Sequence, residues 1–181
     1  LDWSDQGVDG SYRFLNRVWK LVFELKPAVD KAGRLDVNSL GDKGKSLRRI
    51  LHKTIRKVTE DVGDRFHFNT AISAIMELVN AVSSFDDKGN PSSYPVLKEA
   101  AEALVLMMAP FAPHFSEELW SELGHKGGVE ANGWPKYDPD AAIDEELLVV
   151  LQVNGKLRGK LTVPADATQE SVQQNAFADP K

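Results

Sequence analysis

The chain has 181 residues, no cysteine and a formal net charge of −5 at pH 7, with 42% hydrophobic and 27% charged residues. This composition is typical of a folded globular protein, and a chain of this length can bury a hydrophobic core that is stable without disulfide bonds. It excludes a disulfide scaffold, a thiol nucleophile and a cysteine-ligated metal site. The longest apolar run, residues 103–113, contains two prolines and is too short to cross a bilayer. The acidic average also excludes a uniformly basic nucleic-acid binder.

Amphipathic helical spacing dominates the first two thirds of the chain. We expect helices over residues 8–24 and 43–62, a third beginning near Asn69, and a helical segment over residues 94–123. Pro27 and Gly33 would close the first helix, and Asn69 is the expected N-cap of the third. Residues 26–42 and 86–93 are polar and are expected to form loops.

Two prolines interrupt the last of these helical segments. Proline removes a helix hydrogen bond and clashes with the preceding turn. We therefore expect one helix to end near Ala109 and another to begin near Pro113, with Gly124 stopping the second. The sequence thus predicts a helical domain over residues 1–124.

The hydrophobic period changes after residues 125–145, which are rich in Gly, Pro, Asn and Asp and predict a connector. Asn154-Gly155 separates two strand-like runs and predicts a β-hairpin with a type I′ turn. Thr168 is the expected cap of a last helix. Because a lone hairpin is marginal in water, residues 146–181 predict an incomplete C-terminal α/β domain, in a chain that is mainly α.

The helix expected over residues 43–62 is sharply two-faced. Basic residues that step by three and four share one side of it, with no acid among them: Lys45, Arg48, Arg49, His52, Lys53, Arg56 and Lys57. Apolar residues occupy the opposite arc: Leu47, Ile50, Leu51, Ile55, Val58 and Val62.

Like charges on one helix face repel one another, and an anionic partner would relieve that repulsion. RNA phosphates are the first candidate, because their neutralisation releases counterions and drives binding. The stripe alone is equally compatible with a face whose charges pair with acids on neighbouring helices. An acidic phospholipid surface is a weaker third reading, because the apolar arc suits a core better than lipid.

No motif argues for self-contained catalysis. Gly44-Lys45-Ser46 matches only the end of a P-loop, because Ser39 stands where the pattern needs a glycine. The four histidines lack metal-ligand spacing, and no Ser/His/Asp arrangement is evident.

Several runs of residues, read together, resemble one family. They are Arg-Val-Trp-Lys-Leu-Val at 17–22, His-Lys-Thr-Ile at 52–55, the run Phe-Asn-Thr-Ala-Ile-Ser-Ala-Ile-Met-Glu-Leu at 68–78, Ala-Pro-Phe-Ala-Pro-His at 109–114, Glu-Glu-Leu-Trp at 117–120, Val-Asn-Gly-Lys-Leu-Arg-Gly-Lys at 153–160 and Val-Pro-Ala-Asp-Ala-Thr at 163–168. Over nearly its whole length the chain resembles the C-terminal part of bacterial-type leucyl-tRNA synthetases. The runs at 68–72 and 109–114 are shared with the isoleucyl and valyl relatives, whereas the first and the hairpin runs point to leucine.

The resemblance implies a helical bundle known as the anticodon-binding domain, followed by the start of a small α/β domain. It also implies a parent ligase that attaches leucine to its tRNA, using ATP and Mg in a separate catalytic domain. The two ATP-site signatures of the subclass, of the His-Ile-Gly-His and Lys-Met-Ser-Lys-Ser types, are absent. We therefore expect no cofactor and no metal in this fragment, and no activity from it alone. The implied setting is a cytoplasmic monomer, without membrane attachment, whose partners are leucine tRNA and the catalytic domain in cis.

The implied role is to hold the tRNA body so that its acceptor end reaches a distant active site. Phosphate and sugar contacts suit that role better than base readout. The candidate RNA-binding residues are Lys45, Arg48, Arg49, Lys53, Arg56 and Lys57, with Arg13, Arg17 and Lys20 as a second group. The alternatives are the same region of a valyl- or isoleucyl-tRNA synthetase, or a helical interaction module whose basic face docks on protein. A free-standing enzyme is disfavoured by the missing nucleotide motifs.

Overall fold

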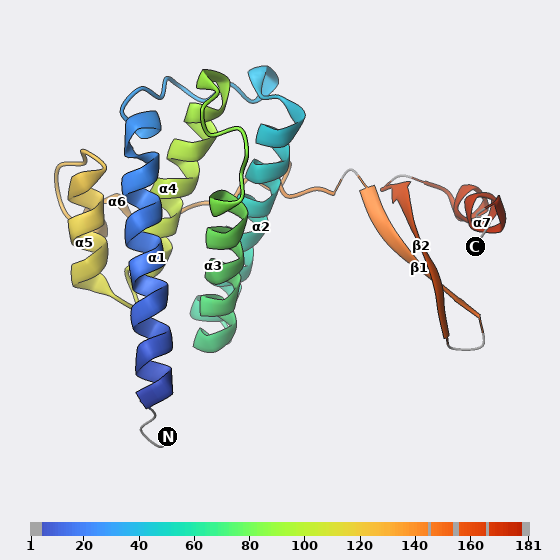
Figure 1. The fold of residues 1–181 in the computed structure, drawn as a ribbon, viewed down its shortest axis with the longest axis horizontal. Helices are drawn as coiled ribbons and strands as arrows, with labels where there is room; N and C mark the ends of the chain where they lie inside the picture. Colours follow the sequence, from blue (N-terminus) through green and yellow to red (C-terminus); the bar gives the residue numbers. More distant parts are fainter. Residues whose placement is uncertain (1–4, 145, 154–155, 166, 179–181) are drawn as a thin grey trace. The chain divides into compact units, whose positions relative to one another are not determined.

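The computed structural model describes residues 5–144, 146–153, 156–165 and 167–178. Two compact units, Leu1–Ala142 and Ile143–Lys181, divide the chain and are described separately. The first contains α1 (Asp5–Val29), α2 (Asp42–Gly63), α3 (Phe68–Ser83), α4 (Tyr94–Met108), α5 (Pro113–Glu122), α6 (Val129–Asn132) and short 3-10 turns at Val37–Ser39 and Pro91–Ser93 (Figure 1). Among the described residues, no helix has the length and apolar character needed to cross a membrane.

The helix α1 continues past the proline that was expected to end it. It runs to Val29, with Pro27 inside its last turn. Leu25, Ala28 and Val29 are all buried there. A proline this close to the C-terminus removes one backbone hydrogen bond, and burial of the three apolar side chains outweighs that loss.

The start of α3 also differs from the expectation. The helix begins at Phe68, so its N-cap is His67 and not Asn69. The His67 carbonyl accepts the N–H groups of Thr70 and Ala71, each at 3.1 Å, and its own N–H donates to the Asp61 carbonyl of α2 at 2.7 Å. The turn back onto α2 therefore sets the start of the helix, in place of a side-chain cap.

The break at the two prolines is confirmed. The helix α4 ends at Met108 and α5 begins at Pro113, which lies in its first turn. Gly124, just past α5, has φ of +86°, the left-handed conformation that glycine adopts without steric cost.

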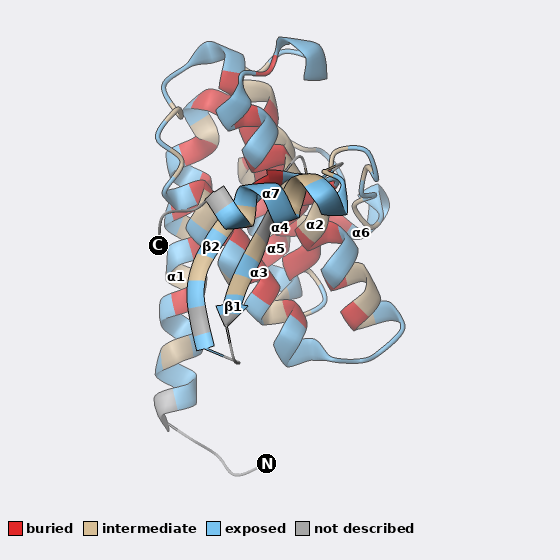
Figure 2. Ribbon diagram, turned by 90° about the vertical axis from the view of Figure 1, so that its right-hand side faces the viewer, coloured by how far each residue is buried: buried red, intermediate tan, exposed pale blue. Residues whose placement is uncertain are grey.

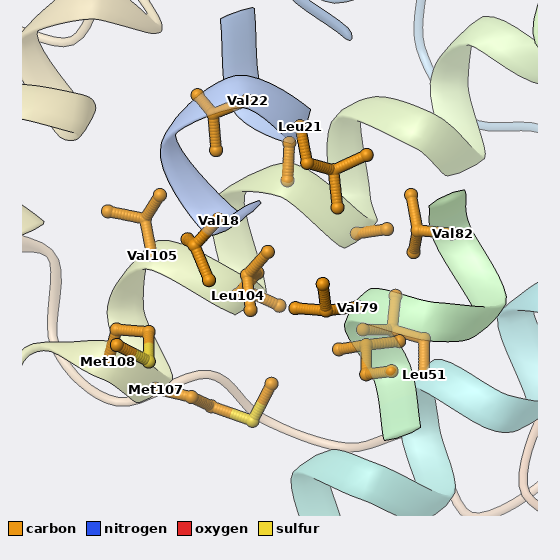
Figure 3. Packing of buried hydrophobic residues seen from close by; sticks show 14 of the residues in the cluster. Val18, Leu21, Val22, Leu51, Val79, Val82, Leu104, Val105, Met107 and Met108 are labelled. Carbon is orange, nitrogen blue, oxygen red and sulfur yellow. The ribbon is translucent and has the colours of Figure 1, made fainter. Parts of the chain in front are cut away.

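The core of the first unit lies where α1, α2 and α3 pack around α4. Val18, Leu51, Val79 and Leu104, one from each of these helices, are at most 1% exposed. Figure 3 shows Val18 of α1 and Val79 of α3 on either side of Leu104 of α4. Buried and exposed residues alternate along the helices, as amphipathic patterns require (Figure 2).

The segment expected to be a connector is packed on the helical unit as far as Ala142. It contains α6, and Val129 is 5% exposed. The Val129 N–H donates to Glu117 Oε1 of α5 at 2.9 Å, and the Trp134 indole N–H donates to Thr59 Oγ1 of α2 at 2.7 Å. We call residues 125–142 the strap. Its Gly- and Pro-rich composition is compatible with a fixed position, because its polar groups find partners on the bundle.

The second unit contains the expected hairpin, β1 (Glu146–Val153) and β2 (Lys156–Pro164), followed by α7 (Gln169–Ala178). The strands are antiparallel, with Val149 opposite Leu161 and an irregularity between Leu151 and Gln152. The Asn154-Gly155 turn lies outside the described residues. The Ser171 N–H donates to Thr168 Oγ1 at 3.3 Å, which confirms Thr168 as the cap of the last helix.

Candidate nucleic-acid interface

The helix α2 carries its core-facing and basic residues on different arcs, as its sequence predicts. Leu47, Leu51, Ile55 and Val58 are at most 3% exposed. Ile50, which was expected on the same apolar arc, is 39% exposed. That position lies at the border of the arc, over a shallow hollow lined also by Lys43 and Phe85.

Arg48 does not lie on the exposed basic face. Its side chain is 10% exposed, and its Nε lies 3.1 Å from Glu99 Oε2 of α4. Its terminal nitrogen lies 3.0 Å from Asp138 Oδ2, in the part of the strap that follows α6. Arg48 is thus enclosed by two carboxylates of its own chain. For this residue the structure shows the alternative in which a basic residue of α2 pairs with acids on neighbouring segments.

His52 completes the same cluster one turn further along α2. It is 3% exposed, and the backbone N–H of Asp138 donates to its Nδ1 at 3.0 Å. An accepting Nδ1 leaves the proton of the neutral ring on Nε2, which donates to Glu99 Oε1 at 3.1 Å. We call Arg48, His52, Glu99 and Asp138 the Arg48 clamp, because they tie α2, α4 and the strap together.

The carboxylates of the Arg48 clamp are held in their charged forms. Burial acts to raise the pKa of Glu99, but hydrogen bonds from His52 and Arg48 and the Arg48 charge bring it below its usual value. The pKa of Asp138 is likewise lowered, mainly by the hydrogen bond from Arg48 against the effect of desolvation. Two carboxylates thus surround the Arg48 guanidinium, so Arg48 adds no net positive charge to the outward face of α2.

The other candidate residues of α2 form an outward-facing row. Lys45, Arg49, Lys53 and Lys57 lie four residues apart, with Arg56 beside them. Lys45, Arg56 and Lys57 are exposed, and Arg49 and Lys53 are half-buried. Lys57 lies 3.0 Å from the buried Asp61, so its charge is partly compensated. We call these five residues the α2 ridge.

The second group of candidates lies on α1. Arg13, Arg17 and Lys20 are all exposed and, with Tyr12 and Asn16, line a shallow hollow along one side of the helix. The Arg17 guanidinium donates to Asn80 of α3. Because α3 packs against both α1 and α2, it stands between the α1 group and the α2 ridge (Figure 1).

Sequence reasoning missed the acidic partners of the Arg48 clamp. Glu99 stands within the apolar pattern of α4, beside Leu97 and Ala100, and this misplaced charge was the available signal. Asp138 lies in an irregular segment, where no periodicity could assign it a neighbour. Within the described ranges, no three acidic or histidine side chains are grouped in a way that could hold a metal ion.

Comparison with known families places this bundle in a class. Residues 44–174 match the model of the anticodon-binding domain of tRNA ligase. The chain therefore belongs to the anticodon-binding domain family of tRNA ligases.

Individual relatives are similar over the whole chain. It is 62% identical over 181 residues to a leucine–tRNA ligase of Geotalea daltonii, and 50% identical over 182 residues to that of Syntrophobacter fumaroxidans. These matches cover 100% and 99% of this chain, and 22% of each relative. Among solved structures, a LeuRS from Agrobacterium radiobacter, in a ternary complex with tRNA and LeuAMS, superposes with a TM-score of 0.85 at 33% identity. That match covers 99% of this chain and 23% of the other, so the chain spans about a fifth of the proteins it resembles.

Proposed function

We propose that this chain is the tRNA-docking region of a leucine–tRNA ligase and that the α2 ridge holds the phosphate backbone of a leucine tRNA. The observation that carries the proposal is the ridge itself. Five basic residues, Lys57 with its Asp61 partner among them, stand together on the outward side of α2, whereas Arg48 is enclosed in the Arg48 clamp. Similarity to leucine–tRNA ligases over the entire chain supports leucine over valine or isoleucine.

The whole ligase would supply what this region lacks. We propose that ATP and Mg act in a catalytic domain elsewhere in a monomeric, cytoplasmic enzyme and that this region holds no cofactor. Its contribution is proximity, because a tRNA body held in place brings the acceptor end to the active site. Residues 146–181 are proposed to be the beginning of a further α/β domain.

The α2 ridge suits positioning better than sequence reading. Lysine and arginine side chains on a convex helix meet phosphates, and such contacts carry no base information. The α1 group of Arg13, Arg17 and Lys20 is a second candidate contact. Arg48 is removed from the phosphate-contact set, since its guanidinium already faces two carboxylates.

The test is a titration of the chain with leucine tRNA at about 50 and 200 mM salt. Affinity changes by about 0.9 log unit per neutralised phosphate per log unit of salt. Five ridge contacts then predict a loss of about 500-fold over that range, and two contacts about 12-fold. When Lys45, Lys53 and Arg56 are replaced by Gln, the loss of affinity over this salt range should fall from about 500-fold toward about 12-fold.

A matched control removes the same charge elsewhere. Lys31, Arg34 and Lys126 are exposed and lie outside α1 and α2. Their replacement by Gln changes the net charge equally. The number of neutralised phosphates calculated from the salt dependence of the affinity should then differ from that of the wild type by less than one. Equal losses in both triple variants, or no binding by the wild type at low salt, would refute the ridge as the RNA contact. A non-leucine tRNA shows whether tRNA shape is read.

A further inference from the structure

The outward face of α3 is polar and carries almost no charge. Helical steps of three and four residues place Asn69, Ser73, Glu77, Asn80 and Ser84 along one side of this helix. All are exposed except Glu77, which is half-buried. We call these five residues the α3 row. It offers hydroxyl and amide groups to a partner, with one carboxylate among them.

Basic side chains border the α3 row on the α1 side. The Arg17 guanidinium donates to Asn80 Oδ1 of the row. Arg13 lines a small hollow together with Met76 of α3, and Lys20 is exposed further along α1. The α1 group therefore runs beside the row instead of standing on a separate face of the bundle.

The α2 ridge borders the α3 row from the other side. Ser46, Ile50, Lys53 and Lys57 step by four, three and four residues, so they lie on one stripe of α2. Ser46 and Ile50 line a hollow that they share with Ala81 of α3. Lys53 and Lys57 continue this stripe, so they form the edge of the ridge that is nearest to α3 (Figure 1).

Two basic edges on either side of one helix match the two strands of an RNA double helix. A helix with its side chains is about 10–12 Å wide. The minor groove of A-form RNA is wide and shallow, is lined by 2′-hydroxyl groups and has a phosphate strand along each border. Helix α3 can therefore lie over this groove while side chains of α1 and α2 contact the bordering phosphates.

The side chains of the α3 row suit base-paired RNA better than unpaired bases. Unpaired bases stack on aromatic side chains, and residues 69–84 include none. Ser73 Oγ donates to the Asn69 carbonyl at 2.9 Å, so its lone pairs can accept from a 2′-hydroxyl. Asn80 accepts from Arg17 through Oδ1, which leaves its NH₂ group to donate to a 2′-hydroxyl oxygen.

Glu77 at the centre of the α3 row also favours the groove. A phosphate repels a carboxylate, so a helix face that followed one phosphate strand would not place an acid there. The minor groove instead presents donors, namely the 2′-hydroxyl groups and the amino group of guanine. A carboxylate between two basic edges therefore fits a position over the groove.

We propose that the α3 row contacts the minor groove of a base-paired tRNA stem through 2′-hydroxyl groups, with Arg13, Arg17 and Lys53 on the phosphates at the two borders. This inference rests on the proposed function, because it takes the partner to be a tRNA. It names the part of that partner which this face recognises, an A-form stem identified by its shape and its 2′-hydroxyls.

The experiment compares the affinity of the chain for two duplexes of the same sequence, each of about 16 base pairs. One is RNA, and in the other every 2′-hydroxyl is methylated, which keeps the A form and the phosphate charges but removes the hydroxyl hydrogen. The RNA should bind about tenfold more tightly, which corresponds to two hydrogen bonds. Equal affinities for the two duplexes would overturn the proposal.

Two pairs of substitutions separate the groove contacts from the phosphate contacts. Ser73→Ala with Asn80→Ala should bring the ratio of the two affinities close to one, while the salt dependence changes by less than one phosphate. Arg13→Gln with Lys53→Gln should weaken both duplexes, keep their ratio and reduce the slope of log affinity against log salt by about 1.8. An unchanged ratio in the first pair would contradict the role of the α3 row.

A matched control removes the same chemical groups from another surface. Asn38 and Ser39 are exposed in the turn between α1 and α2. Asn38→Ala with Ser39→Ala should change neither the ratio of the affinities nor the salt dependence. An equal drop of the ratio in this control and in Ser73→Ala with Asn80→Ala would show that the effect is not specific to α3, and it would overturn the proposal.

Leucine tRNA separates this inference from the proposed function. If the chain binds leucine tRNA through the α2 ridge but binds neither duplex, or binds both equally, the inference fails and the proposed function stands. If the chain binds neither tRNA nor RNA duplex, both fail. Discrimination between the duplexes without binding of leucine tRNA would support the stem contact and refute leucine tRNA as the partner.

Discussion

Replacing Arg48 tests whether the Arg48 clamp holds the strap on the bundle. In Arg48→Met the side-chain volume is largely kept, but Glu99 and Asp138 lose their shared cation. Removing one partner of a fully buried ion pair costs about 3–5 kcal/mol. Here Asp138 is 37% exposed, and Glu99 is 27% exposed and keeps the His52 hydrogen bond. We therefore expect a loss of about 2 kcal/mol in the free energy of unfolding, or about 4–8 °C in Tm.

The assay is urea unfolding followed by tryptophan fluorescence. All four tryptophans lie before residue 142, so the signal reports the helical unit and not the hairpin. Lys45→Met is the control on the same helix, and because Lys45 is exposed it should change stability by less than about 0.5 kcal/mol. Adding Glu99→Gln to Arg48→Met should recover part of the loss, since it removes the unpaired charge. Equal effects of Arg48→Met and Lys45→Met would refute the clamp as a stabilising element.

Two further predictions concern pH and the strap. The folded state lowers the pKa of Glu99, so its charge stabilises the fold above its unfolded pKa, and that stability is lost as the pH falls through the folded pKa. Unfolding free energies measured between pH 7 and 3 should fall less steeply in Glu99→Gln than in the wild type, and parallel curves would count against this. In Gly128→Ala the new Cβ would lie 2.9 Å from Glu117 Oε1, which accepts the Val129 N–H. Urea unfolding should show a loss of about 1 kcal/mol as that hydrogen bond breaks, whereas Gly89→Ala, with open space around it, should show less than half of that.

Some features were predictable because each depends on local chemistry. These are the helix positions, the break before Pro113, the hairpin and the Thr168 cap. Hydrophobic period, proline geometry and capping act within a few residues. The end of α1 and the start of α3 were not predictable in that way. Burial of Val29 outweighed Pro27, and the return of the chain onto Asp61 outweighed the capping preference of Asn69.

Hydrophobic periodicity by itself determined that α2 is two-faced, whereas the family of the chain rests on runs of residues that resemble those of tRNA ligases and on the match of residues 44–174. It could not separate Arg48 from Lys45, because both stand on the same arc of one helix and periodicity says nothing about what approaches that arc. The tertiary structure decided the difference by bringing Glu99 from α4 and Asp138 from the strap against one edge of the arc. A buried cation requires such partners and an exposed one does not. Packing between distant segments therefore divides the basic stripe into the Arg48 clamp and the outward-facing α2 ridge.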